Sequence, residues 1–139
     1  MKIKTDNIFQ VVEFEAPVQE VYEALTKEQL HARFTGMPAQ IENHVGGMFR
    51  TCGQFNFGYN LFLDENKRIV QAWSHKDFTQ GFYSTVVMDF EKTENGTRIN
   101  FNHLGVPEEH CGWLTEGWRK TYWEPLKNFL EVKLVKEVH

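Results

Sequence analysis

The sequence predicts an α+β protein in which a curved antiparallel β-sheet of about six to seven strands carries a long C-terminal helix packed across it. Three observations support this prediction. Residues 40–104 contain successive β-prone, partly alternating segments separated by turn-forming residues. Two short segments with helical spacing precede them, directly after a first strand, and one long amphipathic segment follows them. Strands and helices segregated in this way are typical of the α+β class.

Length and composition limit the kinds of protein this can be. The 139 residues suffice for one core, so we predict a single domain over residues 1–139. The net charge is -4 and the Lys and Arg residues are scattered, so neither nucleic acid nor an anionic membrane surface is an expected partner. Two distant cysteines, the lack of a signal-peptide pattern and the lack of a membrane-length apolar run predict a reduced, soluble, cytoplasmic protein with no membrane span.

The N-terminal quarter of the chain predicts one strand and two short helices. Residues 8–14 are apolar and β-prone. Pro17 is then well suited to the first position of a helix, in which Val18, Val21, Tyr22 and Leu25 recur at helical spacing. Thr26 and Gln29 have the spacing of a capping box and predict a second helix that ends at the breaker Gly36.

Further strands are predicted over residues 40–44, 48–51, 57–63, 68–76, 82–91 and 97–104. The Gly46-Gly47 pair indicates a turn or bulge between the first two of these strands. The Asn95-Gly96 pair is the strongest hairpin signal in the chain, and it predicts a type I′ turn between the last two.

The final predicted element is a long helix that begins near Pro107, with acidic residues in its first turn. One stripe along it is apolar and is expected to be buried on the sheet: Leu114, Trp118, Tyr122, Leu126, Phe129 and Leu130. Pro125 is expected to kink this helix. Gly112 and Gly117 each cost about 1 kcal/mol in a helix relative to Ala, so Gly117 beside Trp118 indicates a close approach by the sheet or a ligand.

Several short motifs, taken together in order, resemble one known family. They are the helix entry at residues 17–22, LTKEQL at 25–30, Phe34-Thr35 ahead of Pro38-Ala39, Gly46-Gly47-x-Phe49, NKRIVQAW at 66–73, Asn95-Gly96-Thr97, Gly105-Val106-Pro107, Gly117-Trp118 and Lys127. On these residues the chain resembles the activator-of-heat-shock-protein-90-ATPase homologues, which lie within the START-like, helix-grip superfamily. The resemblance covers nearly the whole chain.

The resemblance implies a helix-grip fold with a cavity between the sheet and the last helix. In the superfamily such cavities bind lipids, sterols, polyketides or hormones, and some members are aromatases or cyclases. In the eukaryotic co-chaperone, a domain of this kind is joined to a separate N-terminal domain that contacts the chaperone, and the 139 residues here leave no room for one. The resemblance thus implies a small hydrophobic ligand, lipid-like or aromatic, as the first candidate partner and a protein such as a chaperone as the second.

Strand alternation predicts which side chains face the last helix. On this basis Val86, Phe101 and His103 point inward, whereas alternation leaves the orientation of His75 open because both faces of its strand are apolar. The complete set of cavity candidates is Phe34, Phe49, Trp73, His75, Phe82, Val86, Met88, Phe101, His103, Trp118, Tyr122 and Leu126. An aromatic stripe or an inward histidine is equally compatible with ordinary core packing.

No motif in the sequence predicts a metal site, a cofactor or a catalytic residue, because the histidines lack HxH or HExxH spacing and no phosphate-binding loop is present. We therefore predict a non-catalytic protein that binds a small hydrophobic ligand in a cavity between the sheet and the C-terminal helix. One alternative is a co-chaperone or stress-related interaction module. The other is a cyclase- or hydrolase-like enzyme that uses His103 as a general base.

Overall fold

The computed structural model describes residues 2–138, with side chains for residues 2–131. The elements in chain order are β1 (Thr5–Phe14), α1 (Val18–Thr26), α2 (Glu28–Thr35), β2 (Gln40–Ile41), β3 (Met48–Thr51), β4 (Asn56–Asp64), β5 (Arg68–His75), β6 (Ser84–Lys92), β7 (Thr97–Pro107), the 3-10 turn η1 (Glu108–His110), α3 (Cys111–Gly117), the π-helical segment η2 (Trp118–Trp123) and α4 (Glu124–Val138).

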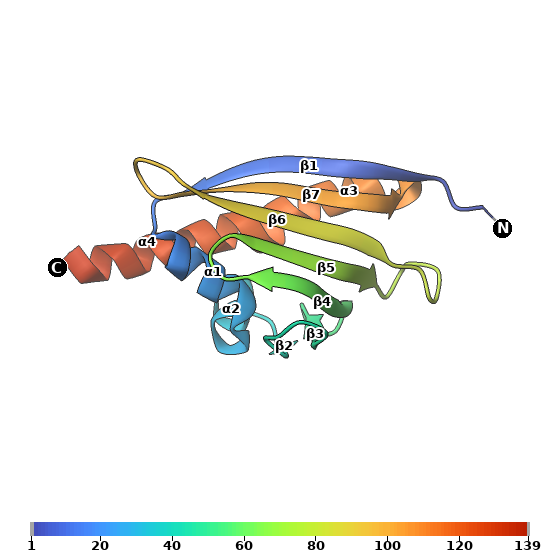
Figure 1. The fold of residues 1–139 in the computed structure, drawn as a ribbon, viewed down its shortest axis with the longest axis horizontal. Helices are drawn as coiled ribbons and strands as arrows, with labels where there is room; N and C mark the ends of the chain where they lie inside the picture. Colours follow the sequence, from blue (N-terminus) through green and yellow to red (C-terminus); the bar gives the residue numbers. More distant parts are fainter. Residues whose placement is uncertain (1, 139) are drawn as a thin grey trace.

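The seven strands form one antiparallel sheet in the order β1-β7-β6-β5-β4-β3-β2. The consecutive elements α3, η2 and α4 form a C-terminal helical run, which crosses one face of this sheet (Figure 1). The short helices α1 and α2 lie beside this run, at the end near β4. The predicted α+β class, with two short helices after the first strand and a long helix on the sheet, is therefore confirmed. Among the described residues, no helix is long and apolar enough to cross a membrane.

The core lies between the sheet and the helical run. Alternate residues of β6 and β7 are buried there, including Val86, Phe101 and His103 at 0% exposure, as alternation predicted. The structure also settles the orientation of β5: Trp73 and His75 face the core, whereas Ala72 lies on the opposite face. Val70 and Ala72 on that opposite face are apolar and half-buried, which is why alternation alone left β5 undecided.

The two short helices form as expected, but the predicted capping box does not. Thr26 is the last residue of α1, and its hydroxyl donates to the Tyr22 carbonyl one turn earlier instead of capping α2. Lys27 occupies the N-cap of α2 and provides no side-chain bond. Gly36 ends α2 in the left-handed conformation, at φ 72°, as its position after the helix predicted.

The predicted strand over residues 40–44 is shortened to two residues. The Glu42 carboxylate accepts the Met48 N–H at 2.8 Å, and the Gly46 N–H donates to the Asn60 carbonyl at 2.7 Å. These bonds turn the chain at Gly46-Gly47 before the ladder can extend, so only Gln40 and Ile41 pair with β3.

The β6–β7 hairpin is present, but its turn is not type I′. A type I′ turn needs positive φ at both central residues. Asn95 has a negative φ, and Lys92 pairs with Thr97 around a four-residue loop. Gly96 is needed here for space, because a Cβ at this position would overlap the Phe14 carbonyl oxygen at the end of β1. Tertiary contact with β1, not the local pair of residues, therefore selects this loop.

The C-terminal helical run contains an irregularity one turn before Pro125. Residues 118–123 are π-helical, and the Glu124 N–H donates to the Arg119 carbonyl five residues back. This wider register places Trp118 and Trp123 on the same face, stacked at 5.8 Å between ring centroids and both buried. The expected apolar stripe is buried on the sheet, except that Phe129 is only partly buried and Trp123 joins it. A π-helical turn is a recognised cause of helix distortion, and proline follows it directly here.

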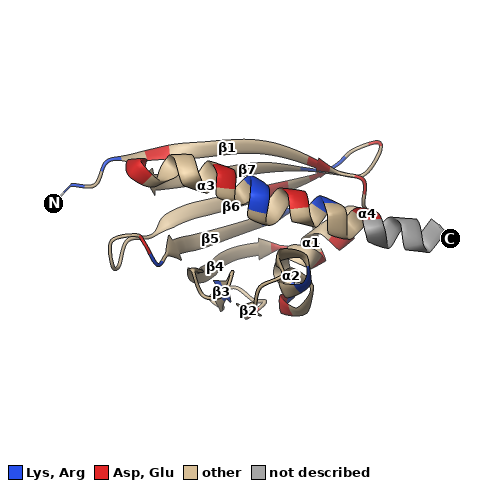
Figure 2. Cartoon of the chain, turned by 180° about the vertical axis from the view of Figure 1, so that it is seen from behind, with Lys and Arg blue, Asp and Glu red and all other residues tan. Residues whose placement is uncertain are grey.

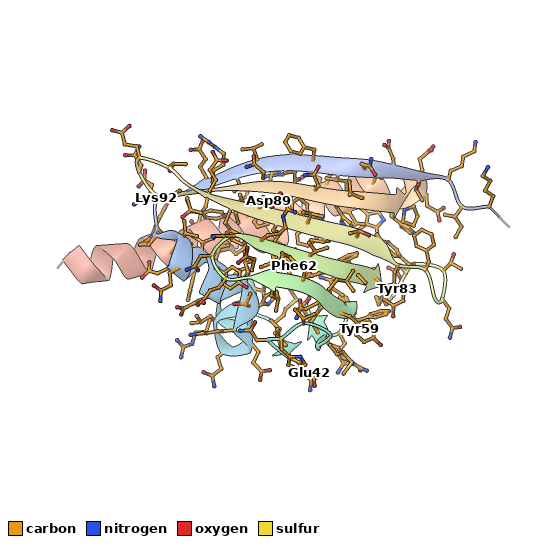
Figure 3. The ribbon with its side chains drawn as sticks, viewed as in Figure 1. Glu42, Tyr59, Phe62, Tyr83, Asp89 and Lys92 are labelled. Carbon is orange, nitrogen blue, oxygen red and sulfur yellow. The ribbon has the colours of Figure 1, made fainter. Side chains whose placement is uncertain are left out.

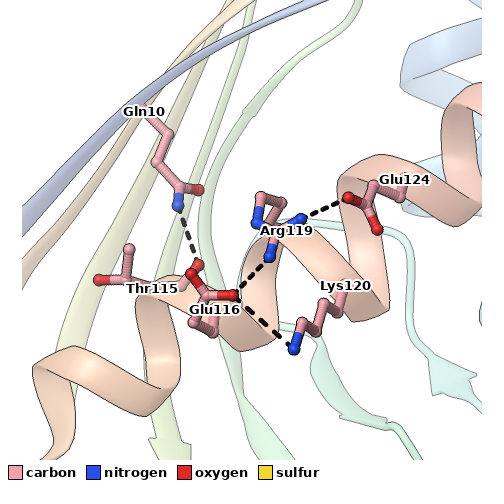
Figure 4. A network of polar contacts seen from close by, with 6 residues as sticks. All are labelled: Gln10, Thr115, Glu116, Arg119, Lys120 and Glu124. Atoms are coloured by element: carbon pink, nitrogen blue, oxygen red, sulfur yellow. Dashed lines mark hydrogen bonds and ion pairs between the residues drawn. The ribbon is translucent and has the colours of Figure 1, made fainter.

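The outward face of this helical run carries charges of both signs (Figure 2). Arg119 pairs with Glu116 and Glu124, and Lys120 lies 3.9 Å from Glu116 (Figure 4). All four side chains are exposed, and exposed ion pairs typically contribute only about 0–1 kcal/mol each. This network is therefore a solvated helix surface.

Gln10 of β1 links the sheet to the helix at two points, one before the π-helical segment and one at its last residue. Its amide nitrogen donates to the Thr115 carbonyl at 3.1 Å (Figure 4), and its amide oxygen accepts the Trp123 indole N–H at 2.7 Å. One side chain thus satisfies a helix carbonyl and the only polar atom of a buried tryptophan ring.

We expect Gln10→Leu to lower the free energy of unfolding by about 1–3 kcal/mol, because the buried Trp123 N–H loses its acceptor. Urea denaturation of the variant and the unmodified protein measures this difference. Gln19→Leu is the matched control: Gln19 is exposed on α1, and its replacement is expected to change stability by no more than about 0.5 kcal/mol. An unchanged midpoint for Gln10→Leu would contradict the assigned role.

Candidate functional site

A pocket of about 290 Å³ opens between the helical run and the β3–β5 end of the sheet. The helix contributes one wall, which includes Gly117, and the sheet with the β3–β4 connection contributes the other. A Cβ at Gly117 would meet nothing within 4 Å, so the missing side chain leaves this space open. The lining residues are Met37, Cys52, Phe55, Asn56, Trp73, His75, Trp113, Leu114, Gly117, Trp118, Thr121 and Tyr122.

Two polar side chains stand next to each other on the sheet wall of this pocket. Asn56 of β4 and His75 of β5 are directly paired across the two strands, so their side chains share the inner face of the sheet. Both residues are 8% exposed. His75 Nδ1 accepts the Asp77 N–H at 3.0 Å, so in the neutral ring the proton lies on Nε2. Burial lowers the pKa of His75, which favours this neutral form.

Aromatic rings surround His75. Trp113 makes an edge-to-face contact with it at 4.8 Å between ring centroids, and Trp73 lies at 6.1 Å. Phe55 adds a third ring at 6.4 Å, and Lys76 Nζ lies over that ring, 4.7 Å from its centroid. A flat ligand in this pocket would therefore meet aromatic surfaces on several sides.

A second, much smaller cavity of about 20 Å³ lies deeper in the core and shares Trp73, Trp118 and Tyr122 with the pocket. A cavity of this size is large enough for one water molecule. On its wall, His31 Nε2 and the Tyr122 hydroxyl lie 2.9 Å apart, and the hydroxyl is 3.2 Å from Thr51 Oγ1. His31 Nδ1 is buried without a partner, and burial lowers the pKa of this histidine to about 4.

His103 is fully buried and both of its ring nitrogens are occupied. Nδ1 accepts the Trp118 indole N–H at 3.0 Å, so Nε2 carries the proton and donates to Ser84 Oγ at 2.7 Å. The Ser84 hydroxyl in turn donates to the Trp73 carbonyl. Burial lowers the pKa of His103 to about 3. The ring therefore ties the helix to the sheet, and this geometry gives no support to its use as a general base.

The structure brings some of the candidate residues together and separates others. Trp73, His75, Trp118 and Tyr122 line the pocket, and Phe49 and Met88 line the small cavity together with Trp73, Trp118 and Tyr122. The remaining six candidates border neither space: Phe34, Val86, Phe101, His103 and Leu126 are buried, and Phe82 is half-buried. On the face over which the cavity is expected, that of Phe82, Val86, Phe101 and His103, ring packing takes up space: Phe101 lies 4.5 Å from Trp118 and 5.2 Å from Trp123 between ring centroids, and His103 lies 5.7 Å from Trp118.

Other residues of the pocket are absent from the sequence-based set of candidates. Cys52, Phe55 and Asn56 reach it because the β3–β4 connection turns sharply through left-handed residues at Cys52 and Gly53. Trp113 of α3 and Thr121 of the π-helical segment complete the pocket from the helix side. A cross-strand register would have identified Asn56 as the neighbour of His75, but the sequence alone did not establish that register.

A sheet closed by one long helix, with a pocket between them, defines a helix-grip protein. Comparison with known proteins specifies the family. Residues 15–131 match the profile described as "Activator of Hsp90 ATPase homolog 1-like protein", and the chain belongs to this family. This confirms the resemblance seen in the sequence motifs.

Individual relatives agree with this assignment. The Homo sapiens protein "Activator of 90 kDa heat shock protein ATPase homolog 1" is 28% identical over 127 residues, which are 91% of this chain and 38% of the human protein. The chain thus spans less than two-fifths of the length of that relative. An HSP90 activator from Plasmodium falciparum has a similar structure, with a TM-score of 0.83 at 22% identity, covering 90% of this chain and 96% of that one. The Aha1 dimer from Colwellia psychrerythraea has a TM-score of 0.77 at 20% identity, with coverage of 91% and 97%.

Proposed function

We propose that this protein binds a small apolar ligand in the pocket between the helical run and the β3–β5 end of the sheet. The observation that carries the proposal is the pocket itself, which opens to solvent, has a volume of about 290 Å³ and is lined mainly by apolar and aromatic side chains. Small-molecule sites are typically about 300–1,000 Å³, mostly apolar, with a few polar groups. The pocket lies at the lower end of that range, so a compact ligand fits best.

Binding is not accompanied by chemistry in this proposal. Among the side chains that the structure describes, none that lines the pocket is Lys, Arg, Asp or Glu. Tyr122 is buried with a pKa held well above its usual value by desolvation, and burial raises the pKa of Cys52. A thiol held protonated in this way is a poor nucleophile. The pocket thus supports binding better than it supports a hydrolase or a cyclase.

The test is saturable binding of an uncharged apolar fluorophore, N-phenyl-1-naphthylamine, to the folded protein. We expect a fluorescence increase that saturates at one probe per chain and is reversed by a flat aromatic competitor such as naphthalene. The competition separates a defined site from nonspecific adsorption. A fluorescence signal that rises linearly with probe, or that naphthalene does not reverse, would overturn the proposal.

Contact with a chaperone of the Hsp90 type is a second candidate function. Relatives of this chain are named as activators of the Hsp90 ATPase, and the sheet face opposite the helix exposes large apolar side chains. Tyr59, Phe62 and Tyr83 lie on this outer sheet face (Figure 3), and Phe9 and Val11 of β1 are 64% and 50% exposed. Exposed apolar patches often mark protein-interaction sites.

The test of this second candidate is titration of the protein into a purified Hsp90-type chaperone while its ATPase rate is followed. We expect the rate to rise, and a double variant, Tyr59→Ser with Tyr83→Ser, to reduce that rise. Phe9→Ser, at the other edge of the same sheet, maps how far the contact extends. An unchanged ATPase rate together with no binding by calorimetry would exclude a direct contact.

A further inference from the structure

The polar pair on the pocket wall indicates what kind of ligand the pocket recognises. Asn56 and His75 are the directly paired residues of β4 and β5, which fixes the distance between their side chains through the sheet ladder. A recognition point built on two strands is more rigid than one built on a loop. Asn56 and His75 are the polar pair on the sheet wall, among the rings of Trp73, Trp113 and Phe55, and Thr121 and Tyr122 face the pocket from the helix wall.

The hydrogen bonds already made by this pair show which capacity is left for a ligand. His75 Nδ1 is occupied by the Asp77 N–H, whereas no described group accepts a bond from Nε2. Among the described residues, the polar side-chain atoms that are both buried and unpartnered do not include His75 Nε2, so this nitrogen is accessible to solvent. Because His75 lines the pocket, a ligand there can reach it. The Asn56 carboxamide carries two N–H donors, and it lines the pocket beside His75. The pair therefore offers donors to an acceptor atom of the ligand, and the Asn56 amide oxygen, which accepts from no described group, offers one acceptor beside them.

The charges around the pocket favour a ligand whose acceptor atom is neutral. None of the lining residues is Lys, Arg, Asp or Glu. At the rim, Lys76 and Asp77 have opposite signs and lie 3.8 Å from each other. A carboxylate in the pocket would lose its hydration without gaining a cation, which is costly, whereas a carbonyl oxygen needs only hydrogen-bond donors.

We propose that Asn56 and His75 form the recognition point of this pocket, and that the ligand class is an uncharged aromatic molecule bearing a carbonyl oxygen. The ring system stacks among Trp73, Trp113 and Phe55, and the carbonyl accepts hydrogen bonds from His75 Nε2 and the Asn56 carboxamide. This inference rests on the proposed ligand-binding function and adds the chemistry of the ligand to it.

The experiment compares three probes of nearly the same shape by calorimetry. 2-Acetylnaphthalene carries the carbonyl, 2-isopropenylnaphthalene replaces its oxygen by a CH₂ group, and 2-naphthoate carries a negative charge. We expect the ketone to bind about tenfold more tightly than the alkene, since one or two hydrogen bonds distinguish them, and the naphthoate to bind more weakly than the ketone.

Two substitutions test whether His75 and Asn56 cause the preference for the ketone over the alkene. His75→Phe keeps an aromatic ring and Asn56→Leu keeps a similar volume, and each is expected to bring ketone affinity toward that of the alkene while alkene affinity changes less than about twofold. If Asn56→Leu does not fold, His75→Phe tests the inference alone. Gln71→Leu is the matched control, because Gln71 lies on the same face of β5 but borders only the small inner cavity.

The outcomes separate this inference from the function on which it rests. Equal affinity of the unmodified protein for ketone and alkene would overturn the recognition point and leave apolar ligand binding intact. Tightest binding of naphthoate would overturn the assignment of a neutral ligand. Absence of binding for all three probes would overturn ligand binding and this inference together.

Discussion

Acidification from pH 7 to pH 5 is expected to lower the free energy of unfolding by about 4 kcal/mol. The reason is the burial of His31 and His103, which lowers their pKa values from 6.5 to about 4 and about 3. The unfolded chain therefore takes up two protons near pH 6.5 that the folded protein does not. Each histidine then costs about 1.4 kcal/mol for each pH unit below 6.5.

The free energy of unfolding falls with acidification because both histidines have a lower pKa in the folded protein than in the unfolded chain. Because the folded pKa values are depressed, stability is highest above pH 6.5 and is lost as the pH falls toward 4, where the folded protein begins to bind the same protons. His75 adds a smaller effect of the same sign, since its pKa is also lowered. The structural cause is clear for His103, where a proton on Nδ1 would face the Trp118 N–H.

Urea denaturation at pH 7, 6 and 5 measures this dependence. His31→Leu removes one of the two sites, and we expect it to reduce the slope of stability against pH between pH 6 and 5 by about 1.4 kcal/mol per unit. His44→Leu, which removes an exposed histidine on the loop before β3, is the control for the change in composition. A free energy of unfolding that stays constant between pH 7 and 5 would show that these rings are not held neutral.

Gly117→Leu is expected to weaken binding of the apolar fluorophore by roughly tenfold or more while the protein stays folded. Gly117 lines the pocket, and a Cβ there meets open space, so a leucine side chain occupies the volume that the ligand needs. Replacing glycine within a helix also removes a penalty of about 1 kcal/mol. Thermal unfolding is therefore expected to show an unchanged or higher midpoint.

Gly112→Leu is the matched control for this experiment. Gly112 lies in the same helix, α3, and a Cβ there also meets open space, but the residue does not line the pocket. It carries the same change in helix propensity, so it should retain the fluorophore affinity of the unmodified protein. Equal binding by the two variants would show that the fluorophore does not occupy this pocket.

Sequence reasoning identified the elements more accurately than the pocket. Strand alternation correctly placed Val86, Phe101 and His103 on the inner face, and the order of patterns gave the fold class. The same alternation predicts a cavity over the face of Phe82, Val86, Phe101 and His103, whereas Phe101 and His103 pack against Trp118 and none of the four lines the pocket. Inward orientation does not distinguish a side chain in the core from one beside an empty space, because both are apolar.

The predicted turn type and the predicted capping box are wrong for the same physical reason: tertiary contacts override the conformation that the local sequence favours. Asn95-Gly96 is a strong local pattern for a type I′ turn, yet the Phe14 carbonyl of β1 packs against Gly96 and a different loop forms. Thr26 and Gln29 have the spacing of a capping box, yet Thr26 remains in the preceding helix and bonds back to Tyr22. Each local preference is worth about 1 kcal/mol, which packing readily exceeds.

The sequence by itself determined the α+β class, the order of the elements, the inner faces of β6 and β7, and the long helix over the sheet, because these depend on periodic burial of many apolar residues. Only the tertiary structure decided the π-helical turn ahead of Pro125, the position of the pocket and the pairing of Asn56 with His75. These features depend on a helix register and a strand register, which are set by how whole surfaces fit together rather than by any short segment.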